Sequence, residues 1–374
     1  MRVTQTMLAN NSLRHMSNGY QNLGKIMDQL ATGKKINRAS QDPVVAMNGM
    51  RYRTQVAEVE QFKRNLGEVY NWMDTADATL DSVTQSLHRI RELTVQASND
   101  TYEETQRANI SKEINQLREH LVALGNSKAN NKYIFNGTNT TTQPIDTTKM
   151  DLKTDNEEFI ANKENFEVTY NGELYKFAGD NGGNTFQSTT GKTIEIDGER
   201  ITHQYTTKDE NGDDKNSTET LKDNQIVISY KDAVSTNNQK VNIEVLKGIN
   251  MNVNINPGQV FSSDFFGDII RLENALNDSS SKSGDITKFL NNISTQMDKV
   301  VNERAELGAR YNRVEMTERR IMEQEVIAKR IMSNNEDADM EKVIMDLKSQ
   351  ETVHRAALAA SARIIQPSLM DFLR

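Results

Sequence analysis

The sequence predicts a mainly α-helical chain, an elongated coiled-coil rod formed by its two arms, with a small β-rich domain inserted in the middle. Prolines occur at positions 43, 144, 257 and 367, so the stretches 44–143 and 258–366 contain none. Because a proline inside a helix costs about 3 kcal/mol, long helices can form in those stretches. Apolar residues recur there in steps of three and four, whereas alternation and turn residues replace that pattern between 136 and 261.

The N-terminal arm, residues 1–42, is expected to be a terminal helix followed by a connecting spoke. An apolar stripe at helical spacing comprises Leu13, Met16, Tyr20, Leu23, Met27 and Leu30. We assign Asn37, Asp42 and Pro43 to the spoke that joins this helix to the rod. Pro43 is also favourable as the first residue of the next helix, and both roles can hold together.

The N-terminal half of the rod is expected over 43–140. Its seam of apolar residues runs without a break through Val59, Phe62, Leu66, Val69, Met73, Ala76, Leu80, Val83, Leu87 and Ile90. A helix carrying that seam is about 45 Å long, more than a domain of ordinary proportions holds, so a coiled-coil rod is predicted. A second run ends near Gly125, and its short connection predicts an antiparallel neighbour.

The C-terminal half of the rod is expected over 261–332, where a seam runs from Ile286 to Ile321. Arg304 and Glu318 occupy two seam positions, and charges there are expected to weaken it. Residues 333–374 carry a further stripe, with Met340, Ile344 and Leu347, and are expected to form a terminal helix that pairs with residues 1–42.

The inserted β-rich domain is expected over 141–260. Alternating residues up to Asn171-Gly172, a dipeptide typical of type I′ turns, predict a hairpin of 166–170 with 174–177. Further strands are expected at 193–197, 201–205, 226–230, 241–246 and 251–255. Leu221 is the only apolar residue from 206 to 225, so that stretch is expected to be an exposed or disordered loop.

Composition limits the possible functions. Apolar residues make up 36% of the chain, which is little for one large core, and the formal net charge of −8 argues against nucleic acid or anionic membranes as partners. No apolar run is long enough to span a membrane, and the first residues lack the apolar region of a Sec signal peptide. With no Cys, thiolate chemistry is excluded.

The terminal stripes are the predicted subunit interface. Two marginal helices can bury only part of their stripes against each other, so the remainder is left for neighbouring subunits. The residues assigned to that interface are Leu13, Tyr20, Leu23, Leu30, Leu347, Leu369, Phe372 and Leu373.

No motif predicts catalysis, a cofactor or a metal site. Gly191-Lys192-Thr193 resembles the end of a phosphate-binding loop, but the upstream Gly is missing and a strand follows, so a turn is expected. The acidic run 209–214 lacks the Gly and Glu positions of an EF-hand and is expected to be a solvated turn. The five His residues, at 15, 88, 120, 203 and 354, form no i, i+4 pair.

Both ends of the chain resemble the flagellin superfamily. The stretch from Leu30 to Pro43, which reads LATGKKINRASQDP, resembles the N-terminal signature, and the runs 307–314, 336–340 and 366–373 resemble the C-terminal helices. Within the superfamily, Met1–Thr4, Tyr133–Gly137 leading to Pro144, and Asp371–Leu373 resemble the hook–filament junction proteins. Lys35 and Gln41 depart from residues that are common in the family.

This resemblance implies a structural protein that is not an enzyme. It implies a homo-oligomeric ring between the hook-side junction protein (hook-associated protein 1) and the flagellin filament, secretion through the flagellar type III apparatus, and a cytoplasmic export chaperone. No cofactor is predicted, and the net charge and hydropathy already argue against nucleic acid and membrane as partners. The alternatives are a flagellin-type filament subunit and, from another class, a flagellum-borne adhesin that uses the β domain.

Overall fold

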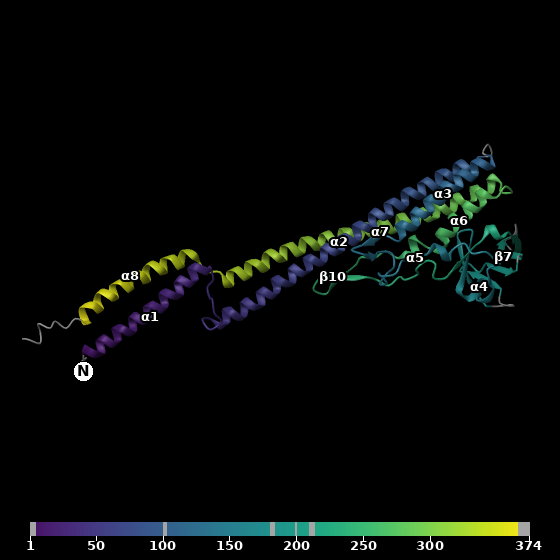
Figure 1. Ribbon diagram of the computed structural model, residues 1–374. Helices are drawn as coiled ribbons and strands as arrows, with labels where there is room; N and C mark the ends of the chain where they lie inside the picture. Colours follow the sequence, from purple (N-terminus) through teal and green to yellow (C-terminus); the bar gives the residue numbers. More distant parts are fainter. Residues whose placement is uncertain (1–4, 100–102, 180–183, 199, 209–213, 366–374) are drawn as a thin grey trace, which may run out of the picture. The chain divides into compact units, whose positions relative to one another are not determined.

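The protein is described from a computed structural model, which covers residues 5–99, 103–179, 184–198, 200–208 and 214–365. The chain divides into two units, one of Met1–Lys63 with Glu318–Arg374 and one of Arg64–Thr317. Two long helices, α2 (Pro43–Ala97) and α7 (Ser283–Glu336), contribute residues to both units. The predicted mainly α-helical fold with a β-rich middle is confirmed (Figure 1).

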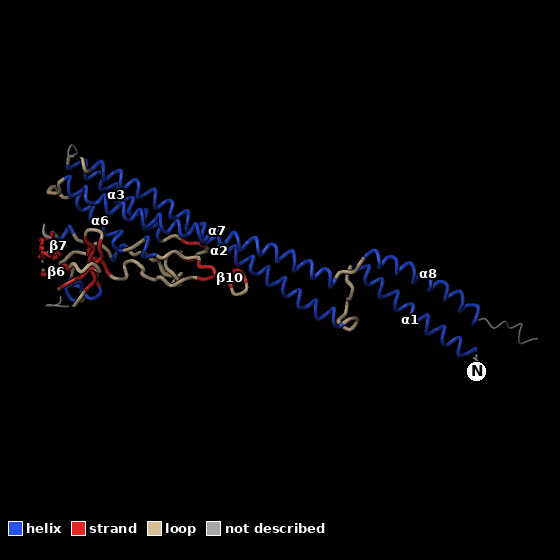
Figure 2. The backbone as a smooth tube through the Cα atoms, turned by 180° about the vertical axis from the view of Figure 1, so that it is seen from behind, coloured by secondary structure: helices blue, strands red, loops and turns tan. Residues whose placement is uncertain are grey.

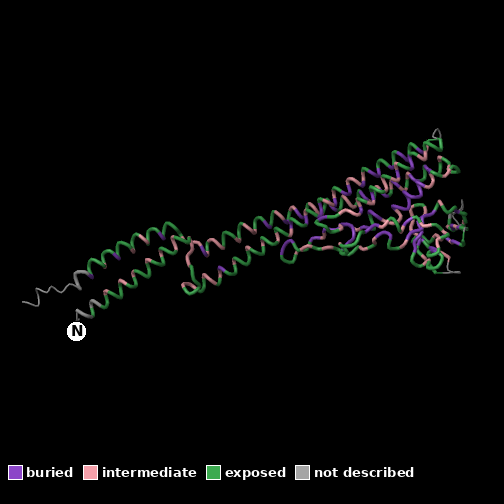
Figure 3. The backbone as a smooth tube through the Cα atoms, in the orientation of Figure 1, coloured by how far each residue is buried: buried purple, intermediate pink, exposed green. Residues whose placement is uncertain are grey.

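The first unit, which we call the arm unit, contains α1 (Gln5–Thr32) and α8 (Met340–Ile365), which lie side by side (Figure 1). It also contains the start of α2 and the end of α7, linked by Lys63 Nζ and Glu325 Oε2 at 3.1 Å. Among the described residues of this unit, Ile321 and Val343 are the only buried apolar side chains. The arm unit therefore has almost no core, and most of its helical surface is exposed (Figure 3).

The second unit, which we call the core unit, holds the predicted seam of the rod. Apolar residues of α2 from Leu66 to Ile90 are buried, as are Ile286, Val300 and Val314 of α7. Helix α3 (Glu104–Gly125) ends at the predicted glycine and is linked back to α2 by Arg89 Nη2 and Glu113 Oε1 at 2.7 Å.

One charged seam position in α7 has partners on α2. Arg304 donates from Nε to Asp77 Oδ1 at 2.8 Å and from Nη1 to Asp81 Oδ1 at 2.5 Å. These hydrogen bonds hold the pKa of Arg304 above its ordinary value, with the bond to Asp77 as the first cause. The two carboxylates compensate the positive charge of Arg304, which from the sequence alone was expected to weaken the seam.

The β-rich part of the core unit is one antiparallel sheet with two small hairpins (Figure 2). The sheet has the order β8-β7-β6-β5-β4-β3-β9. Its strands are β3 (Phe166–Tyr170), β4 (Glu173–Phe177), β5 (Thr185–Ser188), β6 (Thr193–Asp197), β7 (Arg200–Lys208), β8 (Asp214–Leu221) and β9 (Val227–Tyr230). The hairpins pair β1 (Lys128–Ala129) with β2 (Lys132–Tyr133) and β10 (Asn242–Leu246) with β11 (Ile249–Asn252).

Short helices cover the sheet and connect it to the long ones. They are α4 (Glu157–Ala161), α5 (Pro257–Val260), α6 (Ser263–Asn277) and the 3₁₀ turns η1 (Thr147–Lys149), η2 (Lys163–Asn165) and η3 (Asp223–Gln225). Helix α6 contacts both α3 and β3 and is buried along most of its length. A Cβ on Gly267 would lie 2.1 Å from Thr169 Oγ1, so glycine is needed where the helix approaches the strand.

The predicted Asn171-Gly172 hairpin is confirmed. Tyr170 pairs with Glu173, and the two turn residues have φ values of 47° and 76°, as a type I′ turn requires. One face of the sheet buries a core around Phe159, Phe166, Tyr175 and Phe186. Thr193–Asp197 is a strand, also as predicted, and Gly191 lies in the turn before it with φ 85°.

The expected loop over 206–225 is wrong. Strands β7 and β8 pair from Ile201–Leu221 to Lys208–Asp214, with residues 209–213 outside the described chain. The paired residues are mostly Thr, Ser, Asn and charged residues, which suits a strand at the edge of a sheet even with few apolar side chains. Strand β5 was likewise not predicted, since its four residues contain a single large apolar side chain, Phe186.

No described helix is long and apolar enough to cross a membrane.

Candidate functional site

The candidate site is the arm unit, where α1 and α8 meet the connections that lead to α2 and α7. Helix α1 ends where Gly33 takes a left-handed conformation, with φ 68°. Its N–H donates to Gln29 O at 2.8 Å, which satisfies one of the last carbonyls of the helix. Helix α1 therefore ends at a glycine in the left-handed conformation, which residues with a Cβ adopt only at a cost in free energy.

In the outgoing connection, residues 33–42, side chains form hydrogen bonds with backbone groups that have no helical partner. Asn37 accepts a hydrogen bond from Thr32 Oγ1 at 2.9 Å, and its N–H donates to Gln41 Oε1 at 2.8 Å. Gln41 thus supplies an acceptor to the backbone of this connection. Asp42 Oδ1 accepts from the N–H groups of Val44 and Val45 at 3.0 and 3.1 Å.

These contacts decide the local roles of the three predicted spoke residues. Asp42 caps α2 and Pro43 is its first residue, so the helix-start interpretation of Pro43 is confirmed. Asn37 stabilises the connection that precedes the cap. Whether the segment also acts as a spoke in an assembly stays a prediction.

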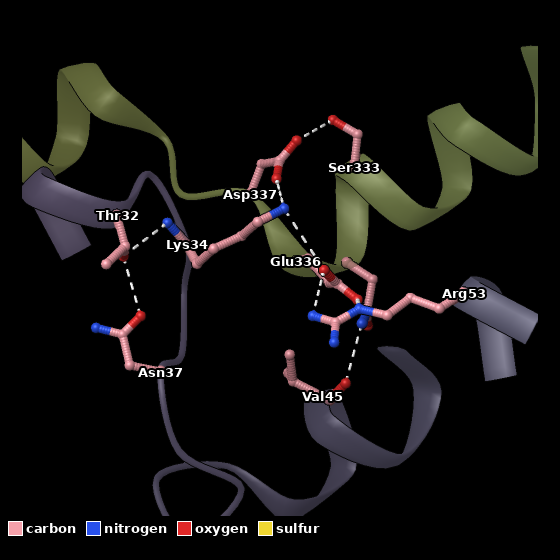
Figure 4. A network of polar contacts seen from close by, with 9 residues as sticks. Thr32, Lys34, Asn37, Val45, Arg53, Ser333, Glu336 and Asp337 are labelled. Carbon is pink, nitrogen blue, oxygen red and sulfur yellow. Dashed lines mark hydrogen bonds and ion pairs between the residues drawn. The ribbon is translucent and has the colours of Figure 1, made fainter. Parts of the chain in front are cut away.

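The returning connection lies antiparallel to the outgoing one. Lys34 and Asp337 form a β-bridge, Lys35 N–H donates to Glu336 O at 2.7 Å, and Ala338 N–H donates to Gly33 O at 2.8 Å. Lys34 Nζ also contacts Asp337 Oδ1 at 2.6 Å (Figure 4). Lys35 Nζ donates to Asn334 O. The two connections of the arm unit are thus bound together by backbone and side chains.

Glu336, at the end of α7, is the most enclosed charge of this network. Arg53 of α2 donates to it twice, Nε to Oε1 at 2.6 Å and Nη2 to Oε2 at 2.8 Å, and Lys34 Nζ lies 3.5 Å from Oε2 (Figure 4). The hydrogen bond from Arg53 is the first cause that lowers the pKa of Glu336. The salt bridge to Lys34 acts in the same direction.

Gly49 allows α2 to approach Glu336. A Cβ at this position would lie 2.9 Å from Glu336 Oε1, closer than a side chain tolerates. Nearby, Asn335 Nδ2 donates to Val45 O at 3.0 Å. Sequence reasoning gave no role to Gly49 or Arg53; a glycine inside a long helix, one turn before an arginine, is the signal that could have pointed to them.

The predicted apolar stripe of α1 divides into two faces. Met16, Leu23, Ile26 and Leu30 are half-buried and share the face on which Gly19 meets Gln350 and His354 of α8. Leu13, Tyr20 and Met27, spaced by seven residues, are 52%, 57% and 55% exposed. On α8, Leu347 is half-buried, whereas Ile344, Met345 and Val353 are exposed.

The predicted interface residues therefore have different surroundings. Leu13 is exposed, and Tyr20 is more than half exposed although one edge of its ring contacts α8. Leu23, Leu30 and Leu347 pack partly within the helix pair, and Leu369, Phe372 and Leu373 lie outside the described residues. The outward row is the part of the stripe that two helices leave uncovered. Helices α1 and α8, which lie within the ranges 1–42 and 333–374, contact each other.

His354 is buried between the two terminal helices. Its ring meets Tyr20 edge-on, with centroids 4.3 Å apart, and neither ring nitrogen has a hydrogen-bond partner among the described residues. Within those residues, no group of three or more His, Asp and Glu side chains is placed to hold a metal ion.

Two family models match the chain outside its β-rich middle. The bacterial flagellin N-terminal helical region matches residues 3–140, and the bacterial flagellin C-terminal helical region matches residues 290–373, together more than half of the chain. The chain belongs to the flagellin superfamily. Members of this superfamily are structural proteins of the flagellum and not enzymes, as the sequence predicted for this chain.

Individual relatives of this flagellin-superfamily protein include both flagellins and a hook-associated protein. The flagellin of Clostridium tyrobutyricum is 33% identical over 127 residues, 34% of each chain. Flagellar hook-associated protein 3 of Escherichia coli is 28% identical over 146 residues, 39% of this chain and 46% of that protein. The match thus spans a third to a half of these curated relatives.

The fold is shared with a solved structure from Vibrio parahaemolyticus that is described as a flagellar hook-associated protein. The TM-score is 0.54 at 14% identity, covering 79% of this chain and all of that one. At that identity the likeness concerns the fold alone. The superfamily's N-terminal signature in this chain, residues 30–43, coincides with the end of α1, the outgoing connection and the cap of α2.

Proposed function

We propose that this protein is the hook–filament junction subunit of the bacterial flagellum, the role of a hook-associated protein 3. In this proposal, subunits form a ring through residues 1–42 and 333–374. The hook-side junction protein, hook-associated protein 1, lies below the ring and the flagellin filament above it. Residues 43–140 and 261–332 form the rod of each subunit, and residues 141–260 face outward.

The observation that carries the proposal is the uncovered apolar row on the terminal helix pair. Leu13, Tyr20 and Met27 repeat at heptad spacing on α1, and Ile344, Met345 and Val353 are exposed on α8. Burying a large apolar side chain stabilises by about 1.5–3 kcal/mol, so this row favours association with neighbouring helices. Because the arm unit has almost no core, its stable state is expected to be the assembled one.

The choice of junction protein over filament subunit is supported by three sequence features, two at the ends of the chain and one after the first rod segment. The opening Met1–Thr4, the stretch from Tyr133 to Pro144 and the ending Asp371–Leu373 resemble junction proteins. Curated relatives include hook-associated protein 3 of Escherichia coli and of Salmonella typhimurium. Export unfolded through the flagellar type III channel, with a cytoplasmic chaperone, belongs to the same proposal.

The deciding experiment is electron microscopy of flagella from a strain that lacks this gene. We expect bare hooks and flagellin secreted into the medium, with filaments restored by the intact gene. Filaments that form normally in the deletion strain contradict the junction role. Purified protein that polymerises alone into long filaments supports the flagellin alternative instead.

Point substitutions test the uncovered row. Tyr20→Glu and Leu13→Glu place a charge on the row and are expected to abolish filament attachment in the complemented strain. Ile160→Glu is the matched control, because Ile160 is an apolar side chain that is 60% exposed on α4 of the β-rich domain. Full motility with Tyr20→Glu overturns the role of the row.

A further inference from the structure

A small pocket in the arm unit lies between the outgoing connection and the first turns of α2. Its volume is about 220 Å³, below the roughly 300–1,000 Å³ that small-molecule sites occupy. One large side chain of another polypeptide suits this volume better than a whole ligand does. None of the predicted interface residues that the structure describes lines the pocket.

The pocket combines apolar side chains with a free cation. Its apolar lining residues are Ile36, Ala39, Val45, Ala46 and Met50. The side chain of Met50 is 64% exposed, so this part of the lining is open to a partner. Arg38 also lines the pocket and is exposed, and its guanidinium has no hydrogen bond or ion pair among the described residues.

The other charges of the lining are compensated within the arm unit. Arg53 donates twice to Glu336, and Lys34 Nζ contacts Asp337 Oδ1 at 2.6 Å. Arg38 is therefore the lining charge that is left over. An occupant that places an acidic group beside an apolar side chain matches both features of the pocket.

Residues 366–374 carry this combination. They read QPSLMDFLR, so the acidic Asp371 is followed directly by the apolar side chains of Phe372 and Leu373. Both apolar residues belong to the predicted subunit interface. Residues 1–4, MRVT, carry a basic side chain instead, which the free cation of the pocket repels. The C-terminal segment is therefore the better match of the two.

The segment that enters the pocket has to come from a second copy. Helix α8 begins at Met340, close to the pocket residue Glu336, and runs alongside α1 to Ile365, about 39 Å away (Figure 1). Phe372 lies seven residues after Ile365 and can reach back at most about 25 Å. The pocket of its own chain is thus out of reach.

We propose that residues 366–374 of one copy dock into this pocket of the next copy, with Phe372 against the apolar lining and Asp371 paired with Arg38. The two surfaces differ, so the contact is head-to-tail, and contacts of this kind close into rings or continue as helices. The inference rests on the proposed assembly through the terminal arms and adds the site where one subunit holds the next.

The first test is disulfide trapping in assembled flagella, which is clean because the chain contains no Cys. Met50→Cys and Phe372→Cys are combined in one gene that complements the deletion strain, and isolated flagella are oxidised. We expect a ladder of linked chains on a non-reducing gel, and no ladder when either substitution is made alone. Met322→Cys with Phe372→Cys is the control, because Met322 is 46% exposed on α7 and does not line the pocket.

The second test does not depend on assembly and uses the purified full chain at concentrations where it is monomeric. A fluorescent synthetic peptide of residues 366–374 is expected to bind, and Phe372→Ala in the peptide to weaken binding about tenfold. Arg38→Glu in the chain should weaken binding as well, and Asp371→Arg in the peptide should restore binding to that variant.

A matched pair of methionines controls the peptide measurement. Met50→Ala removes a lining side chain and is expected to weaken binding, whereas Met47, 62% exposed on the same helix, does not line the pocket. Met47→Ala should therefore bind the peptide as the intact chain does. Equal binding by the two variants, or no binding of the peptide to the intact chain, overturns the proposal.

The outcomes also separate this inference from the junction role. Attached filaments in the doubly substituted strain without a ladder overturn the docking and leave the junction role intact. Normal filaments in the deletion strain contradict the junction role, and the peptide measurement then still decides the docking. The peptide measurement likewise decides if the two cysteine substitutions prevent filament attachment.

Discussion

Arg53 and Glu336, 283 positions apart in the sequence, form a bidentate ion pair with N–O distances of 2.6 and 2.8 Å. The pair joins the start of α2 to the end of α7 at the place where both lead into the arm connections. The side chain of Glu336 is 8% exposed, whereas that of Arg53 is 66% exposed. Arg53 thus covers an otherwise enclosed carboxylate from the solvent side.

Replacing Arg53 should loosen the connections of the arm. Arg53→Met leaves Glu336 with Lys34 alone, and we expect a loss of about 1–2 kcal/mol, because a bidentate charged bond is removed but the arginine is partly solvated. Hydrogen exchange of residues 33–42 and 336–339 measures this loss. Arg51→Met, on the exposed side of the same helix, is the control; equal protection in both variants contradicts the role of the pair.

Acid should loosen the same connections. Glu336 and Asp337 have pKa values below their ordinary 4.5 and 3.8, through hydrogen bonds from Arg53 and Lys34 respectively. The folded arm therefore binds fewer protons than the unfolded chain, and the stabilisation is present above the ordinary pKa values and is lost as pH falls below them.

We expect the protection of residues 33–42, taken relative to the intrinsic exchange rate at each pH, to fall as the pH falls from about 5 toward 3, the range where carboxylates titrate. Glu336→Gln is expected to flatten this pH dependence, since it removes one titrating group while keeping much of the shape. An unchanged pH profile in that variant is the contrary outcome.

Much of the helical architecture could be predicted because it depends on local spacing. The seam from Leu66 to Ile90 and the end of α3 at Gly125 follow from periodicity and a breaker residue. Strands in which apolar residues alternate with polar ones, such as Thr193–Asp197, could also be predicted. Strand β8 could not be predicted from hydrophobicity, because mainly polar residues pair with β7 through their backbone hydrogen bonds.

In the candidate site, too, local contacts could be predicted from the sequence and long-range contacts could not. Asp42-Pro43 was predictable as a cap because its partners are the next residues in the chain. The contact of Arg53 with Glu336 depends on the return of a helix 283 positions later, which no local pattern specifies. The division of the α1 stripe into an inner and an outer face likewise needs the position of α8.

Two glycines of α2 should respond in opposite ways to alanine. Gly67 has open space around it, so Gly67→Ala is expected to raise stability by about 0.5–1 kcal/mol through helix propensity alone. Gly49→Ala gains the same propensity but drives a methyl group against Glu336 Oε1, which Arg53 holds in place. We expect it to destabilise the arm, as measured by hydrogen exchange; a gain equal to that of Gly67→Ala shows that the carboxylate moves freely.

His354 should be a source of weakness in the terminal helix pair. Both of its ring nitrogens are buried without a partner among the described residues, against the edge of Tyr20. His354→Leu keeps much of the volume and removes two unsatisfied polar atoms, so we expect a gain of about 1 kcal/mol in the stability of α1 and α8. Hydrogen exchange of residues 12–30 and 343–361 measures that gain, with His120→Leu, on the exposed surface of α3, as the control. Faster exchange in His354→Leu indicates instead that the ring nitrogens are hydrogen-bonded in solution, and a change in filament attachment places His354 at a subunit contact.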